Sequence, residues 1–401
     1  MRDEATVRRD VLRECLGRLL LKSHRLSPDE LPHFVERELR ASGIGEPVVY
    51  VVNHEQTELV PLPPRDDLSP LAVDSTDAGR AYQSETELVS GSSPKRLWLP
   101  MRDGVDRLGI LALTGEEFDE ATITRCREIA TVVAQLLISK NQFTDVNHVR
   151  RRSRAMTLGA EFRWSLLPPI SFSCDAVSVA AALEPAYEVA GDAFDYALNG
   201  DELHIAVFDG MGHGLEASRL TNLTLAAYRH CRRRNLDIEA TRGDLDGVIA
   251  EVFGAERFVT AQIAALDTQR GTLRIVNAGH PGPLLIRDKR IVTSGTTNVG
   301  VPLGVGAEFR QPAMLSTVEL QPGDQVFFYT DGLTDAVAPD GTPFGLEGLV
   351  DTVNSACGDN VPPSETVRRL MHSVVAHRGA TWRDDAMVVM VTWRPDALPK
   401  E

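Results

Sequence analysis

The chain has 401 residues, with 42 Lys and Arg against 57 Asp and Glu, so its formal net charge is −15. Its length predicts two or three domains, and 43% hydrophobic and 25% charged residues are ordinary values for globular proteins that bury a core. This composition excludes a disordered chain, a collagen and a disulfide scaffold. The acidic balance argues against a general binder of nucleic acid or of anionic membranes, because both partners favour an excess of Lys and Arg.

The acidic excess is unevenly distributed along the chain. Residues 1–140 carry 18 basic and 24 acidic side chains, residues 141–168 carry 5 and 2, and residues 169–401 carry 19 and 31. A short basic segment therefore separates two acidic regions. The five cysteines are scattered, no apolar signal sequence opens the chain, and no apolar stretch approaches the roughly 20 residues of a spanning helix. We expect a cytoplasmic protein with reduced thiols.

Helical and extended patterns alternate over the first 140 residues. Apolar residues at helical spacing predict a helix over residues 5–22, and Ser27, Pro28 and Glu30 predict the start of a second one, which Gly43 ends. The next elements are a strand at Val48–Val52, a loop region over residues 61–95, a hairpin of Arg96–Pro100 and Leu108–Leu113, and a long helix from Asp119.

The segment LWLPMRDGVDRLGILALTGEEFDEATITRCREIATVVAQLL at residues 97–137 resembles a GAF sensor domain. The resemblance covers residues 10–140 and implies an α/β GAF-like domain, a class that often binds small molecules or dimerises. No residue identifies a ligand, and a module that only packs and dimerises is the alternative.

The segment from Asp119 to Leu167 has no proline and one glycine, Gly159. Its apolar residues recur at helical spacing, which predicts a continuous signalling helix, with a parallel dimeric coiled coil as one arrangement. Residues 141–168 are thus expected to be a helical linker, ended by Pro168 and Pro169, in a homodimer. Its arginines are expected to form a solvated face, with docking of a partner as the alternative.

Short apolar strands dominate the chain beyond residue 169, with a helix over Leu215–Arg234. The expected strands are Val177–Leu183, His204–Phe208, Val259–Leu266, Thr272–Asn277, Pro283–Ile286, Gln325–Thr330 and Ala386–Trp393. Many strands without regular alternation with helices predict an α+β or layered β-sandwich domain over residues 169–395.

Acidic residues stand at the ends of several of these strands. Asp209 and Asp331 are each followed by glycine, Asp384 and Asp385 open the last strand, and Asp192 follows Gly191. Carboxylates that converge at strand tips repel one another unless a hard divalent cation neutralises them. The alternative interpretation is that each Asp-Gly pair is only a turn. The motifs of zinc hydrolases and P-loop enzymes do not occur.

Residues 160–393 resemble the SpoIIE/RsbU-type branch of the PPM metal-dependent serine/threonine protein phosphatases. The segments that carry the resemblance are SLLPP, EPAYEVAGDAFDYAL, IAVFDGMGHGLEAS, RFVTAQIAALD, RIVNAGHPGPLLI, VPLGV, PGDQVFFYTDGLTDA and DDAMVVMV. The resemblance implies a two-sheet β-sandwich flanked by helices, with two Mn2+ or Mg2+ ions at one edge.

The resemblance also implies a role for each acidic position. Asp209 corresponds to the carboxylate that bridges both metals, Gly210 to a backbone-carbonyl contributor, Asp192 to a ligand of one metal, and Asp331 and Asp384 to ligands of the other. Asp385 is the second choice for the last position. Asn277, Gly279 and His280 correspond to a loop near the metals. The residue after Gly210 is Met211, where eukaryotic relatives have a histidine, so the general acid is unassigned, with His213 as a weak candidate.

The expected function is that of a GAF-regulated phosphatase that acts on phosphoserine or phosphothreonine. The usual substrates in this branch are STAS-domain anti-anti-sigma proteins of partner-switching pathways. The alternatives are a phosphatase-like module that binds without hydrolysis and a sensor scaffold. We also expect the linker to act on the segment that holds Asp192, through residues such as Phe162, Trp164 and Leu166.

Overall fold

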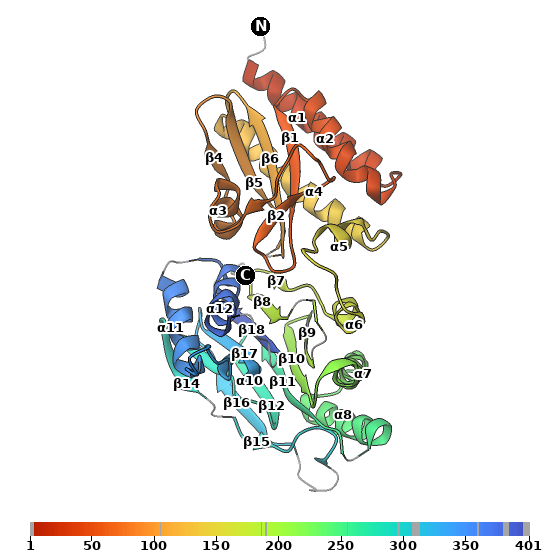
Figure 1. The fold of residues 1–401 in the computed structure, drawn as a ribbon, viewed down its shortest axis with the longest axis vertical. Coiled ribbons are helices and arrows are strands. Elements are labelled where there is room, and N and C mark those ends of the chain that lie inside the picture. The colour runs from red at the N-terminus through yellow and green to blue at the C-terminus, as the bar shows by residue number, and fades with distance from the viewer. Residues whose placement is uncertain are drawn as a thin grey trace. The chain divides into compact units, whose positions relative to one another are not determined.

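The computed structural model describes residues 4–104, 106–185, 187–188, 191–254, 256–294, 297–306, 313–358, 361–379 and 385–395. The chain divides into two compact units, Met1–Ala155 and Met156–Glu401 (Figure 1). The division lies within the segment predicted as a linker. Among the described helices, none is long and apolar enough to cross a membrane.

The N-terminal unit is built on one six-stranded antiparallel sheet with the order β3-β2-β1-β6-β5-β4. The strands are β1 (Glu46–Val52), β2 (Glu58–Pro61), β3 (Leu71–Ala72), β4 (Leu88–Ser90), β5 (Lys95–Asp103) and β6 (Asp106–Gly115). Alternate side chains of β1 enter different cores, since Val49 and Val51 belong to one apolar cluster and Tyr50 and Val52 to the other.

Helices cover both faces of this sheet. The cluster that contains Val49 also holds apolar residues of α1 (Glu4–Ser23), α2 (Leu31–Ala41) and α4 (Glu120–Asn141), and a short 3-10 turn at Pro28–Glu30 precedes α2. The other cluster holds α3 (Asp77–Ser84). The two helices predicted before β1 are confirmed.

The prediction of a loop throughout residues 61–95 is wrong, because α3 lies within it. Thr76 caps the helix by accepting a hydrogen bond from the Gly79 amide at 3.1 Å. Ala78, Ala81 and Tyr82 are buried against the sheet. Only eight residues form this helix, so its apolar face is short and is fixed by tertiary packing rather than by a long periodic pattern.

The prediction of a continuous helix from Asp119 to Leu167 is also wrong. The chain forms α4, then α5 (Val146–Arg150) and α6 (Leu158–Leu166). Thr144 accepts a hydrogen bond from the Val146 amide at 3.2 Å, and Thr157 accepts one from the Ala160 amide at 3.3 Å. Hydroxyl groups at these positions stabilise new helix starts, so they interrupt a segment that has no proline.

The C-terminal unit is a sandwich of two six-stranded sheets. One sheet has the order β15-β12-β11-β10-β9, with β16 paired to β12, and the other has the order β14-β13-β17-β18-β8-β7. The first consists of β9 (Asp192–Asn199), β10 (Glu202–Gly210), β11 (Val259–Asp267), β12 (Thr272–Ala278), β15 (Val299–Gly300) and β16 (Leu315–Glu319). The second consists of β7 (Ser171–Ser173), β8 (Val177–Glu184), β13 (Leu284–Arg287), β14 (Arg290–Ser294), β17 (Gln325–Tyr329) and β18 (Ala386–Trp393).

Apolar side chains of both sheets share one core. Phe194 and Val207 of the first sheet lie in the same cluster as Val179, Phe328 and Val389 of the second. The sheets therefore pack face to face, and the predicted two-sheet α+β sandwich is confirmed.

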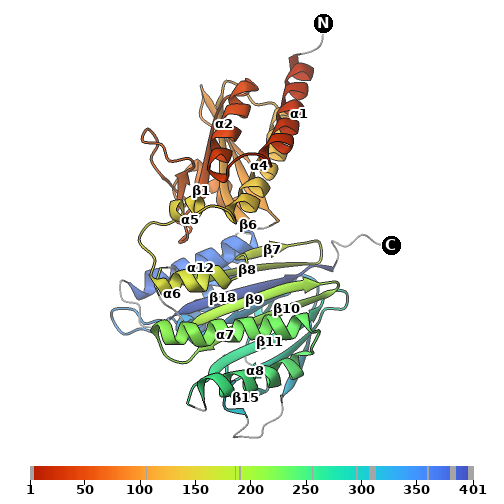
Figure 2. The same ribbon diagram turned by 90° about the vertical axis from the view of Figure 1, so that its right-hand side faces the viewer.

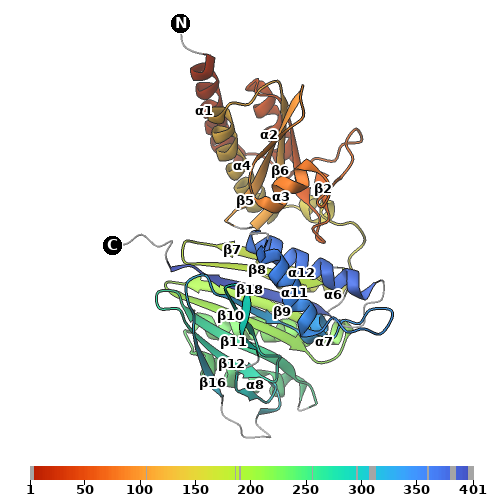
Figure 3. The same ribbon diagram turned by 90° about the vertical axis from the view of Figure 1, so that its left-hand side faces the viewer.

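Pairs of helices cover the two outer faces of the sandwich. α7 (Gly214–Arg233) and α8 (Ile238–Phe253) lie over the sheet of β9 to β12 (Figure 2). α11 (Gly345–Gly358) and α12 (Pro363–Arg378) lie over the other sheet (Figure 3). The short helix α10 (Asp331–Thr334) follows β17 directly.

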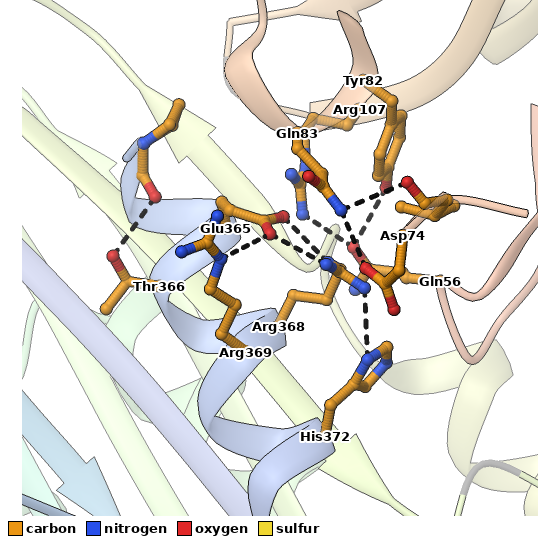
Figure 4. A network of polar contacts seen from close by, with 12 residues as sticks. Gln56, Asp74, Tyr82, Gln83, Arg107, Glu365, Thr366, Arg368, Arg369 and His372 are labelled. Atoms are coloured by element: carbon orange, nitrogen blue, oxygen red, sulfur yellow. Dashed lines mark hydrogen bonds and ion pairs between the residues drawn. The ribbon is translucent and has the colours of Figure 1, made fainter. Parts of the chain in front are cut away.

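Each unit contains a buried polar network of its own (Figure 4). In the N-terminal unit, Tyr82 and Arg107 both donate to the Gln56 side-chain oxygen, at 3.0 and 2.9 Å. In α12, the fully buried Glu365 accepts hydrogen bonds from Arg368 and Arg369 at 2.8–3.0 Å. Both networks pair the polar groups of buried side chains, as protein interiors require.

Candidate metal centre

The register of the first sheet places Asp192 beside Asp209. Asp192 opens β9, Asp209 lies near the end of β10, and the two residues are direct cross-strand partners. Directly opposite residues of an antiparallel pair project from the same face, with Cβ atoms about 4.5–5.5 Å apart. Asp192 is 3% exposed. Two carboxylates predicted as candidate ligands are thus neighbours at one edge of the sandwich.

Thr330 connects Asp192 to the second sheet. Its hydroxyl donates to Asp192 Oδ2 at 2.7 Å and accepts a hydrogen bond from the Met387 amide of β18 at 2.9 Å. The Thr330 amide in turn donates to the Met387 carbonyl at 3.1 Å. Asp331, the next residue in the chain, opens α10 and is exposed at the same edge.

Two glycines allow the ends of β9 and β10 to approach closely. The Gly191 carbonyl accepts hydrogen bonds from the Gly210 amide and from the Thr221 hydroxyl of α7. A Cβ on Gly210 would lie 2.2 Å from the Thr221 oxygen, and one on Gly191 would lie 2.7 Å from the Gly210 carbonyl oxygen. A side chain at either position would push the two carboxylate-bearing strand ends apart.

A salt-bridged pair of arginines anchors β9 three residues after Asp192. Asp195 is 1% exposed, and its two carboxylate oxygens accept from Arg229 and Arg232 of α7, each at 2.7 Å. A buried carboxylate between two arginines fixes the strand against the helix.

The start of β18 lies against the same edge. Asp385 accepts a hydrogen bond from the Gly191 amide, and a Cβ on Gly332 would lie 1.7 Å from the Asp385 carbonyl oxygen. Asp384, the predicted ligand, lies outside the described residues. Through its hydrogen bond with the Gly191 amide, the Asp385 side chain connects the start of β18 to the residue before β9.

His280 is held deep behind Asp209. Its Nε2 donates to the Tyr329 carbonyl at 3.0 Å, so Nδ1 accepts from the Thr260 hydroxyl at 2.8 Å. Thr260 is the cross-strand partner of Asp209, with 3.5 Å between its hydroxyl oxygen and Asp209 Oδ2. Burial lowers the pKa of His280 to about 4, which keeps the imidazole neutral. This geometry gives His280 a structural role.

The rest of the predicted loop closes around the same histidine. Asn277 accepts from the His280 amide and donates to the His280 carbonyl, both at 2.9 Å. A Cβ on Gly279 would lie 2.8 Å from the Pro302 ring. In contrast, Met211 and His213 are exposed in the turn between β10 and α7.

The described residues bring two of the predicted metal ligands together. Asp192 and Asp209 offer neighbouring oxygen donors of the kind that Mg2+ and Mn2+ prefer, and the Gly210 carbonyl ends the same strand. Within the described part of the chain, no group of three or more His, Cys, Asp or Glu side chains is arranged to hold a metal ion. Asp331 and Asp384 stay predicted ligands: Asp331 is exposed at the start of α10, and Asp384 lies outside the described residues.

Three threonines are part of this edge and were not predicted from the sequence. Thr330 donates to the Asp192 carboxylate and Thr221 to the Gly191 carbonyl, while the Thr260 hydroxyl lies 3.5 Å from Asp209 Oδ2. Only Thr330 carried a sequence signal, since it immediately precedes the Asp331-Gly332 turn.

Comparisons with known proteins agree with the resemblance on which these residues were chosen. Residues 199–394 match the family model described as Stage II sporulation protein E (SpoIIE). Protein IcfG of Synechocystis sp. is 24% identical over 225 residues, which cover 49% of this chain and 35% of that protein. Phosphoserine phosphatase RsbP of Bacillus subtilis is 25% identical over 227 residues, which cover 54% of this chain and 52% of that protein.

Among solved structures, the SiaA-PP2C domain of Pseudomonas aeruginosa aligns with 59% of this chain and 93% of its own length, at 20% identity and a TM-score of 0.48. The chain spans about half or less of the length of the two curated relatives. Residues 199–394, just under half of this chain, are thus similar to the SpoIIE family.

Proposed function

We propose that this chain is a metal-dependent protein serine/threonine phosphatase. Asp192, Asp209, Asp331 and Asp384 would hold two Mn2+ or Mg2+ ions, with the Gly210 carbonyl as a further contributor. The observation that carries the proposal is the register of β9 and β10, which makes Asp192 and Asp209 cross-strand neighbours. The Thr330 hydroxyl adds to it, because it orients Asp192 from the other sheet.

In the proposed hydrolysis, the metals and the protein side chains have different roles. When bound, the metals supply Lewis acidity, which lowers the pKa of water and offsets the charge of a phosphoryl group. The chain orients the ligands: Thr330 fixes one Asp192 oxygen, and the Thr221 hydroxyl and Gly210 amide fix the backbone before it. The neutral, enclosed His280 supports this edge and is no general acid, so leaving-group protonation falls to another group.

The proposed substrate is phosphoserine or phosphothreonine on a STAS-domain regulator of a bacterial partner-switching pathway. The match to the SpoIIE model supports this, as does the relative named as a phosphoserine phosphatase. The N-terminal unit is proposed as a GAF-like regulatory domain, with residues 141–168 as its linker, in a cytoplasmic homodimer. The six-stranded antiparallel sheet with helices on both faces supports the proposal of a GAF-like domain.

The test is hydrolysis of p-nitrophenyl phosphate and of a phosphoserine peptide with Mn2+, Mg2+ or EDTA. We expect a metal-dependent rate that Asp209→Asn lowers by at least a hundredfold, together with weaker Mn2+ binding in titration calorimetry. Asp175→Asn is the matched control, since it removes one charge from an exposed turn residue. No metal-dependent rate, or an undiminished rate in Asp209→Asn, would leave the chain as a non-catalytic binding module or sensor scaffold.

A further inference from the structure

Arg163 of α6 is a buried cation close to the candidate metal centre. The residue is 1% exposed, and its Nη2 donates to the Pro185 carbonyl at 2.5 Å. Its Nε and Nη1 are buried and have no hydrogen-bond partner within the described part of the chain. Leaving the donors of a charged group unmet in an interior is costly, so a position of this kind calls for a compensating interaction.

The compensating interaction is electrostatic. Burial lowers the pKa of Arg163, and the negative charges of Asp385, Asp192 and Glu184 act against that shift. Arginine retains its proton in proteins, so the guanidinium is a fixed positive charge on which these carboxylates act. Asp192 is a candidate metal ligand, and Asp385 holds the Gly191 amide directly before it. One side chain of α6 thus acts on both acidic groups at the start of β9.

The same helix is tied to the chain segment that leads into Asp192. Besides the contact of Arg163 with the Pro185 carbonyl, the Thr157 amide donates to the Tyr187 carbonyl at 2.9 Å. At the other end of α6, Arg229 of α7 donates to the Leu166 carbonyl at 2.6 Å. The position of α6 is therefore linked to those of Pro185 and Tyr187, which precede Asp192 in the chain.

We infer that Arg163 is a positioning residue through which α6 sets the metal affinity of the centre. The inference rests on the proposed metal centre and deepens it, because it names the residue by which α6, which precedes the matched residues 199–394, would act on a candidate metal ligand. Arg163 holds Pro185, seven residues before Asp192, by its hydrogen bond, and its charge acts on the Asp192 and Asp385 carboxylates. Displacing α6 then loosens the ligand segment.

The test compares Mn2+ binding to the full chain, measured by titration calorimetry and by the electron paramagnetic resonance of free Mn2+. Arg163→Met keeps an apolar stem but removes the charge and the hydrogen bond. We expect it to raise the Mn2+ dissociation constant at least tenfold, in the range found for residues that support metal ligands. Arg163→Lys keeps the charge but cannot reach Pro185 and face the carboxylates at once, so we expect at least a threefold rise. Arg233→Met is the matched control, because it removes an exposed arginine from α7, and it should bind Mn2+ as the wild type does.

Each outcome decides between two interpretations. A dissociation constant for Arg163→Met within twofold of the wild type, or below it, would overturn the inference, since a pure counter-charge would weaken cation binding rather than support it. If Arg163→Met does not fold by circular dichroism, Arg163→Lys decides alone, and unchanged binding in that variant would overturn the inference. Failure of the wild type to bind Mn2+ would instead refute the metal centre, and the inference with it.

Discussion

Thr330→Val is the sharpest test of how the two sheets cooperate at the candidate metal centre. Valine has nearly the shape of threonine, so the change removes a hydroxyl and leaves packing intact. The hydroxyl is 1% exposed and makes two hydrogen bonds, one to the Asp192 carboxylate and one from the Met387 amide. A hydrogen bond to a charged group contributes about 1.5–3 kcal/mol, and a buried amide left without an acceptor costs about 1–3 kcal/mol. We therefore expect the free energy of unfolding of the C-terminal unit to fall by about 3 kcal/mol.

Thr392→Val on β18 is the matched control. Thr392 is 4% exposed, and its hydroxyl has no hydrogen-bond partner within the described ranges, so the same substitution should be neutral or slightly stabilising. Thr330→Ser is the complementary control, since it keeps the hydroxyl and loses one methyl group, at about 1 kcal/mol. Urea unfolding followed by circular dichroism, fitted for the transition of the C-terminal unit, measures all three variants. A two-unit chain is not expected to unfold in one step, so the two transitions are fitted separately.

A free energy of unfolding for Thr330→Val that lies within about 0.5 kcal/mol of the wild type would refute this reasoning. Equal losses in Thr330→Val and Thr392→Val would do the same, because the loss would then belong to the buried hydroxyl as such and not to its bonds.

Two further predictions concern the same edge of the sandwich. Gly332→Ala should destabilise the C-terminal unit by more than about 3 kcal/mol and weaken Mn2+ binding, because the added Cβ meets the Asp385 backbone. Gly243→Ala, inside helix α8, meets no atom within 4 Å and should stabilise the unit by about 1 kcal/mol in thermal unfolding. The imidazole of His280 should stay neutral at pH 6, with its proton on Nε2. NMR should show that this imidazole titrates near pH 4. Titration near pH 6.5 would contradict the burial of the ring. Since an unfolded histidine binds its proton near pH 6.5, stability linked to His280 is complete above that pH and is lost as the pH falls from 6.5 to about 4, by about 3 kcal/mol in all.

The sandwich strands were predictable because their chemistry is local. Runs such as Gln325–Tyr329 are apolar and end at turn residues, so composition alone marks them. β9 was not predicted as a strand, because two aspartates stand in its first four residues. Asp195 is compensated there by Arg229 and Arg232 of α7, a contact that exists only after folding.

The candidate site was predictable by residue type but not by arrangement. The positions of Asp192 and Asp209 in the sequence do not fix their pairing, because a shift of one residue in register would turn one side chain to the opposite face. The register follows from the short turn that joins β9 to β10. The prediction of one continuous linker helix was wrong for a related reason: the hydroxyls of Thr144 and Thr157 accept hydrogen bonds at the starts of new helices, a signal that a search for proline and glycine does not detect.

The buried carboxylates of the C-terminal unit differ in how their charge is met. Asp195 forms ion pairs with two arginines, and Asp324 forms a two-pronged ion pair with Arg287. Asp192 accepts a hydrogen bond from the neutral Thr330 hydroxyl, and the buried charge of Arg163 acts on it as well. A divalent cation bound between Asp192 and Asp209 would neutralise negative charge at this edge. The charge of Arg163 acts on the same carboxylate, so a positioning role requires that Mn2+ affinity falls when Arg163 is removed, whereas a pure counter-charge would make it rise.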